Sequence, residues 1–204
     1  MDPSESGSAA PTTCHLSWQA AIGREFFTDP SLYGRVRERL IDAHQRRGRV
    51  LVHYTMLPRE IHLLSQIAPG DSSGAIARAI GNVVARWVGE WQAVRSPVFA
   101  GPYRAQAIAG DVELRHVLRM LVWRPVRLGR CGTPSHHAHS SLRTALGLRP
   151  AHGFDARPLL RLFGESVPQA RAALRAWLSQ RPSEREARQW ELACGLALAT
   201  GAVG

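Results

Sequence analysis

Two short apolar segments separated by a single break constrain the fold of this chain more than any other feature. Residues 49–57 (RVLVHYTML) and 60–67 (EIHLLSQI) are rich in β-branched, aromatic and leucine side chains, and Pro58 with Arg59 interrupts them. Two segments of this length and composition around a break are typical of a β-hairpin. We therefore expect an antiparallel sheet that contains this hairpin.

Helical and strand patterns alternate around the hairpin. The pattern predicts strands at 14–18 and 97–108 and helices at 31–46, 73–94 and 111–122. The third helix is expected to end before Arg124-Pro125, because a residue that precedes proline disfavours the α region. Beyond residue 129 only short helices are expected, at 140–146, 157–163, 167–179 and 183–200. This order predicts an α+β fold, with helices packed on an antiparallel sheet and short helices at the C-terminal end.

The charge of the chain narrows the class of partner. The 204 residues contain 26 basic and 16 acidic side chains, a net charge of +10, and no lysine is present, so every basic residue is an arginine. Guanidinium groups stay charged and present a planar set of donors that suits phosphate. The excess of arginine therefore points to nucleic acid as the partner.

Composition also indicates the cellular compartment and the division of the chain into domains. No apolar run approaches the length of a membrane span, the N-terminal segment is polar, and Cys14, Cys131 and Cys194 are widely scattered. We expect a cytoplasmic protein without export, membrane association or disulfides. Residues 1–12 are expected to be disordered, 13–150 to form the main domain, and 151–204 to form a helical extension.

Motifs in chain order resemble those of one family. They are residues 56–64 (MLPREIHLL), 98–108 (VFAGPYRAQAI), 118–129 (LRMLVWRPVRLG) and 140–148 (SSLRTALGL). Together they are similar to motifs of the REP-associated tyrosine transposases, a branch of the IS-two-hundred-like transposases of the single-tyrosine HUH type. The similarity implies a ferredoxin-like HUH fold for residues 13–150, DNA transposition as the family activity, and a homodimer.

The resemblance also implies a metal-dependent reaction. In the family, two histidines around an apolar residue hold a divalent cation, and a tyrosine from a nearby helix attacks the scissile phosphate. The matching positions here are Glu60, Ile61 and His62. Glu60 and His62 lie two apart on a strand, face the same side, and would still suit Mg²⁺ or Mn²⁺. The alternative is that Glu60 is a solvated residue and His62 an ordinary hydrogen-bonded histidine.

The remaining catalytic positions depart further from the family. Met120 stands at the position of the family's tyrosine, and a thioether has no ionisable oxygen with which to attack phosphorus. Arg124 stands where the family has asparagine, and its charge would repel a nearby metal ion. Tyr54 and Tyr103 occupy positions that the family fills with aromatic packing residues. We therefore expect strand cleavage to be lost or impaired.

The DNA-binding half of the family machinery is expected to remain. The arginines predicted to contact phosphates are Arg104, Arg119, Arg124, Arg127 and Arg130. The leading hypothesis is a protein that binds single-stranded or hairpin DNA. Two alternatives stay open: an active single-strand nuclease that uses Glu60, His62 and either water or Tyr103, and a dimeric protein interaction module.

Overall fold

The computed structural model describes residues 11–45, 48–93 and 96–196. These residues include one four-stranded sheet. The strands are β1 (Thr12–Gln19), β2 (Val50–Leu57), β3 (Glu60–Ile67) and β4 (Arg104–Ile108). All neighbouring strands are antiparallel in the order β2-β3-β1-β4, so β2 and β4 form the edges. The predicted α+β class and the predicted hairpin of β2 and β3 are confirmed.

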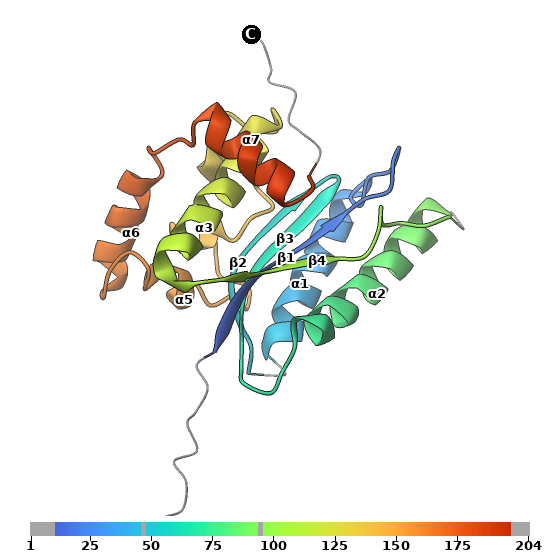
Figure 1. Cartoon of the computed structure of the whole chain (residues 1–204), viewed down its shortest axis with the longest axis horizontal. Coiled ribbons are helices and arrows are strands. Elements are labelled where there is room, and N and C mark those ends of the chain that lie inside the picture. The colour runs from blue at the N-terminus through green and yellow to red at the C-terminus, as the bar shows by residue number, and fades with distance from the viewer. Residues whose placement is uncertain (1–10, 46–47, 94–95, 197–204) are drawn as a thin grey trace, which may run out of the picture.

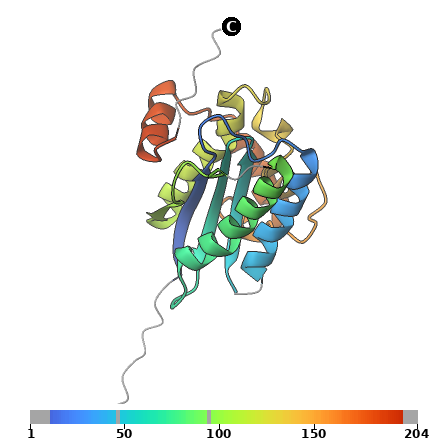
Figure 2. The ribbon, with the colours of Figure 1, turned by 90° about the vertical axis from the view of Figure 1, so that its right-hand side faces the viewer.

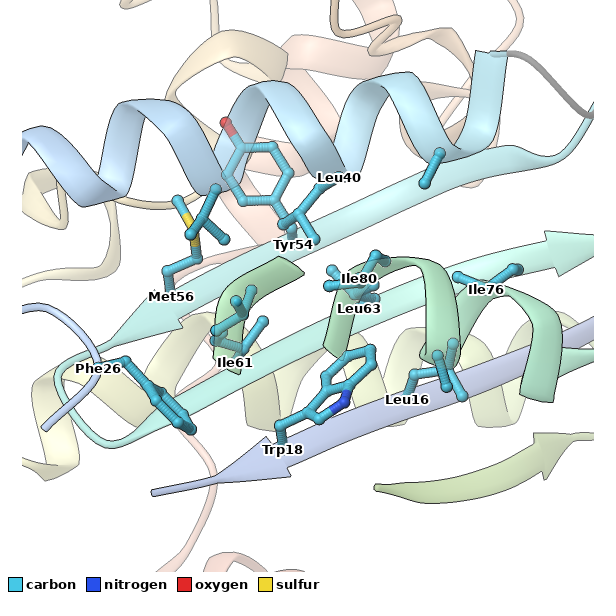
Figure 3. Close-up of a cluster of buried hydrophobic side chains, with 14 of the residues drawn as sticks. Leu16, Trp18, Phe26, Leu40, Tyr54, Met56, Ile61, Leu63, Ile76 and Ile80 are labelled. Atoms are coloured by element: carbon cyan, nitrogen blue, oxygen red, sulfur yellow. The ribbon is translucent and has the colours of Figure 1, made fainter. Parts of the chain in front are cut away.

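Two long helices cover one face of the sheet. Helices α1 (Pro30–Gln45) and α2 (Ser73–Gln92) lie side by side on this face (Figures 1 and 2). Strand residues that face them, such as Leu16, Ile61 and Leu63, are fully buried in one apolar cluster with the two helices (Figure 3). Alternation along the strands therefore directs the intervening side chains to the opposite face.

The opposite face is covered by α3 and the C-terminal helices (Figure 1). These elements are α3 (Gly110–Arg127), η1 (Pro134–His136), α4 (Leu142–Ala145), α5 (Arg157–Leu160), α6 (Val167–Trp177) and α7 (Glu184–Ala193). Residues of α3, α5, α6 and α7 share one apolar cluster with Val52 and Leu64 of the sheet. The described part of the predicted C-terminal extension thus packs into the same core as α3.

Helix α3 does not end where the sequence predicts. It continues through Pro125 to Arg127, although an internal proline removes one backbone hydrogen bond. Arg124, the residue before proline, is held in the helix by ion pairs with Glu60 and Glu191, and Pro125 is itself buried. These tertiary contacts outweigh the local preference of the Arg-Pro pair.

The predicted strand at 97–108 is also wrong in its first half. Only Arg104–Ile108 pairs as β4, while Phe99 makes an isolated bridge to Ala20 and the Gly101-Pro102 segment bends. Proline lacks the amide donor that a strand ladder needs, which explains the late start of β4.

Some boundary predictions fall outside the described residues. These concern residues 1–10, Arg46, Val94 and positions 197–200. Strand β1 begins at Thr12, within the segment that was expected to be disordered. No helix in the described part of the chain has the length and apolar character needed to cross a membrane.

Candidate functional site

The sheet face beneath α3 and α7 carries an unusual line of polar side chains. Ile61 points into the α1 and α2 cluster, so Glu60 and His62 on the same strand point to the α3 side. Strand β1 adds Ser17 beside His62 and, two residues earlier, His15. All four are buried, with His62 fully enclosed, so the alternative that Glu60 is a solvated residue is wrong. Buried polar groups of this kind need partners.

Hydrogen bonds join the three ionisable groups of this face. Nε2 of His62 donates to Oε2 of Glu60 at 3.0 Å, and Nδ1 of His62 shares a hydrogen bond with Nε2 of His15 at 3.1 Å, whose direction depends on the tautomers. The two imidazoles are also stacked, with centroids 5.3 Å apart. Burial, followed by the charge of His62, lowers the pKa of His15 to about 3. His15 is therefore neutral at pH 7.

Arg124 of α3 completes the bonding of Glu60. Its Nε and Nη2 donate to the two carboxylate oxygens at 2.9 and 2.5 Å, while Nη1 donates to Glu191 of α7 at 2.6 Å. The Arg124 side chain is only 1% exposed. Burial alone would raise the pKa of Glu60, but hydrogen bonds from Arg124 and His62 lower it to about 2. Both partners of the Arg124–Glu60 pair are consequently charged at neutral pH.

Helix α7 supplies the remaining groups. Glu191, 1% exposed, also accepts from Arg127 at 3.0 Å, and Trp190 packs over the rings of His15 and His62 with centroid distances of 5.9 and 6.1 Å. We refer to the connected polar side chains of this face as the Arg124 network, which consists of His15, Glu60, His62, Arg124, Arg127 and Glu191. Glu191 and Trp190 are absent from the predicted site, although their place on one helical face with Ala187 and Cys194 is a visible signal.

The residues of the Arg124 network do not fit a divalent metal ion. Both oxygens of Glu60 and both ring nitrogens of His62 already have partners in the network. The guanidinium lies 2.5 Å from the carboxylate oxygen that a cation would need, and its charge opposes a second cation. The described residues contain no group of three His, Cys, Asp or Glu side chains placed to ligate a metal.

The structure also places the candidate nucleophiles. Met120 lies one turn before Arg124 on α3 and is buried in the apolar cluster of that face. Tyr54 belongs to the apolar cluster under α1 and α2 (Figure 3), and Tyr103 packs against that cluster. This cluster lies on the opposite face of the sheet from Glu60. No tyrosine of the described chain therefore faces the Arg124 network.

The five arginines predicted to contact DNA divide into two groups. Arg119 and Arg127 are paired with Glu186 and Glu184 of α7, and Arg124 is enclosed in the Arg124 network. The prediction that Arg124 contacts DNA phosphates is therefore wrong, because Arg124 is buried and paired with Glu60 and Glu191. Arg104 is exposed on the edge strand β4, and Arg130 is half exposed at 4.0 Å from Glu25.

The molecule is an α+β protein in which α3, with Met120 and Arg124, covers the face of the antiparallel sheet that bears Glu60 and His62. Comparison with solved structures agrees: the chain resembles a REP-associated tyrosine transposase bound to a REP hairpin, with a TM-score of 0.57 and 17% identity. The match covers 76% of this chain and 93% of the other. The chain therefore has the fold of that transposase, as its motifs predict.

Other comparisons add less. A protein from Deinococcus radiodurans R1 assigned as a transposase matches 58% of this chain and 94% of its own length at 16% identity, with a TM-score of only 0.43. No protein-family model and no curated protein matches the chain.

Proposed function

We propose that this chain is a DNA-binding protein that keeps the transposase fold and does not cleave DNA. The main observation that supports the loss of cleavage is that the guanidinium of Arg124 donates two hydrogen bonds to the carboxylate of Glu60, so that neither oxygen is available to a metal ion. The family's metal ligands match Glu60 and His62, and its tyrosine matches the buried Met120. The fold is thus retained while the two chemical requirements of strand cleavage are replaced.

The surface proposed to contact DNA surrounds Arg104. Two neighbouring clefts of about 310 and 370 Å³ share Ser17 and Arg104, and Gln19 and Gln106 add further polar groups, one to each cleft. Among the described residues, no acidic side chain lines either cleft. An exposed guanidinium flanked by neutral donors suits a phosphate backbone, and the net charge of +10 favours approach of a polyanion.

DNA binding is expected to depend on salt and not on divalent metal. Arginine contacts with phosphates release counterions, so the affinity for a labelled hairpin should fall at least about tenfold between about 50 and 200 mM salt. EDTA should leave the affinity unchanged, because no metal joins the protein to the phosphates. An electrophoretic mobility shift titration measures both; affinity that ignores salt would argue against the proposal.

Arg104→Gln is expected to weaken DNA binding severalfold for all sequences alike. A phosphate contact carries no base information, so the loss should be uniform and the salt dependence should decrease by about one counterion. Arg157→Gln is the matched control, because Arg157 is an exposed arginine already paired with Asp155 at 2.9 Å. Equal effects of both substitutions would show that only net charge matters and that Arg104 marks no binding surface.

Single-stranded or hairpin DNA as the ligand, a homodimer and a cytoplasmic location complete the proposal. The dimer rests on the family resemblance alone, and sedimentation of the purified chain tests it. The three free cysteines fit a reducing compartment.

A further inference from the structure

A third cleft, of about 270 Å³, lies at the β2 edge on the side of α1. Arg37 of α1 and Arg149 line it, together with the aromatic rings of Tyr33, Tyr54 and His139. Tyr54 and Met56 lie along β2 beneath α1 in Figure 3, with the tyrosine oxygen directed out of the apolar cluster. This cleft is on the opposite face of the sheet from Glu60, so it is separate from the Arg124 network.

The cleft concentrates positive charge without a compensating carboxylate. Among the described residues, no acidic side chain lines it, and no ion pair links Arg37 or Arg149 to one. Glu25, which acts on Tyr33, lies 4.0 Å from Arg130. Two guanidinium groups without a nearby anion repel each other, and an anion placed between them would relieve that repulsion.

The positive charges of Arg37 and Arg149 influence the same two side chains of the cleft, His139 and Tyr54. Burial, followed by the charges of His137, Arg149 and Arg37, lowers the pKa of His139 to about 4. Burial raises the pKa of Tyr54, and the charges of Arg149 and Arg37 both oppose that shift. Since both arginines influence both rings, their positive potentials overlap inside the cleft.

Arg149 is held in place by hydrogen bonds to neighbouring groups of the protein. Arg149 donates to the carbonyls of Ala138 and Ser140 at 2.7 and 2.9 Å and to the hydroxyl oxygen of Tyr54 at 3.0 Å. In the described part of the chain, Nε of Arg37 and Nε of Arg149 are both buried without a hydrogen-bond partner. A buried donor without an acceptor is costly, and a bound anion that draws in the guanidinium would supply one.

Stacked aromatic rings form the wall of the cleft beside these arginines. His139 stacks on Tyr33 with centroids 3.5 Å apart, and Phe27 stacks on the other face of Tyr33 at 4.0 Å. The hydroxyl of Tyr54 is an additional donor, because it already accepts from Arg149. The cleft thus combines two cations, a hydroxyl donor and preformed walls.

We propose that Arg37, Arg149 and Tyr54 form a binding site for a phosphate group. The tetrahedral oxygens of phosphate match two guanidinium groups and a hydroxyl, and charge-assisted hydrogen bonds of this kind are strong. The phosphate comes either from the end of a DNA strand or from a free phosphate compound. The inference does not depend on the proposed DNA binding, since inorganic phosphate alone tests it.

Isothermal titration calorimetry of the full chain with inorganic phosphate, at constant ionic strength set with chloride, tests the site. Wild type should show saturable binding, and Arg37→Gln should weaken it about tenfold or more, as expected for loss of a charge-assisted contact. Arg86→Gln removes the same charge from the exposed surface of α2 and should bind as wild type does. Arg37→Lys should fall between wild type and Arg37→Gln.

The outcomes separate the two sources of phosphate. A preference for a 5′-phosphorylated over a 5′-hydroxyl oligonucleotide that disappears in Arg37→Gln identifies a DNA end. Saturable phosphate binding without that preference identifies a free phosphate compound. Absence of saturable phosphate binding by wild type, or equal binding by Arg37→Gln and wild type, overturns the proposal. If Arg37→Gln does not fold, the wild-type titration and Arg37→Lys decide.

Discussion

Replacement of Arg124 by methionine is expected to lower the free energy of unfolding by about 3 to 5 kcal/mol. The substitution leaves the carboxylates of Glu60 and Glu191 buried without their shared cation. A carboxylate that loses its partner in a dry interior must either remain charged at high cost or take up a proton. For a domain whose total stability is about 5 to 15 kcal/mol, this is a large fraction.

Urea denaturation followed by circular dichroism measures this change, and two controls give it meaning. Arg157→Met removes an arginine from an exposed pair, and its effect should be small. Adding Glu60→Gln to Arg124→Met removes the carboxylate that has lost its cation and should recover much of the loss, while Glu191 keeps its ion pair with Arg127. A loss below about 1 kcal/mol in Arg124→Met would mean that the Arg124 network is not closed as described.

Mild acid is expected to unfold the protein at a pH well above the range in which its carboxylates take up protons. Burial is the main cause that lowers the pKa of His15 and His53 to about 3 and of His44 to about 4. In the unfolded chain these imidazoles take up protons near pH 6.5, whereas in the folded protein they stay neutral to a much lower pH. The free energy of unfolding therefore falls as the pH drops below about 6.5. Each histidine accounts for about 2 kcal/mol between about pH 6.5 and 5.

The effect of the histidines and that of Glu60 have the same sign, and the pH range in which each appears distinguishes them. The lowered pKa of Glu60 gives stability that is present above its ordinary value and lost only as the pH falls toward about 2. Denaturation midpoints measured from pH 7.5 to 4.5 should therefore decline steeply before carboxylates titrate. His44→Gln, which removes one buried imidazole, should reduce the slope by up to one proton. A flat profile down to pH 5 would contradict the neutral, buried state of these rings.

Local patterns in the sequence predicted most of the secondary structure. The third strand is Glu60–Ile67 as expected, because its residues alternate or run apolar between clear breaks. The place of Met120 on a helix that packs on the sheet also agrees with the helix predicted over 111–122 from local spacing. These features depend on neighbours in the chain, which the sequence displays directly.

Contacts between residues far apart in the chain could not be predicted from the sequence. Arg124 meets Glu60 and Glu191 across 64 and 67 positions, and no local pattern reveals such partners. The same contacts carry α3 through Pro125, against the preference of the residue before proline. A charged residue on an apolar helical face, as Glu191 is on α7, was the available signal of a buried ion pair.

The most direct test of the account is one reaction with labelled hairpin DNA, purified full chain and Mn²⁺ or Mg²⁺, split between two gels. A native gel reports binding, and a denaturing protein gel reports covalent attachment through a phosphotyrosine. We expect a shifted band on the first gel and no labelled protein on the second, with either metal, because Arg124 holds the carboxylate of Glu60 and Met120 stands at the position of the family's tyrosine. A metal-dependent adduct that maps to a tyrosine, or the absence of any shifted band, would contradict it.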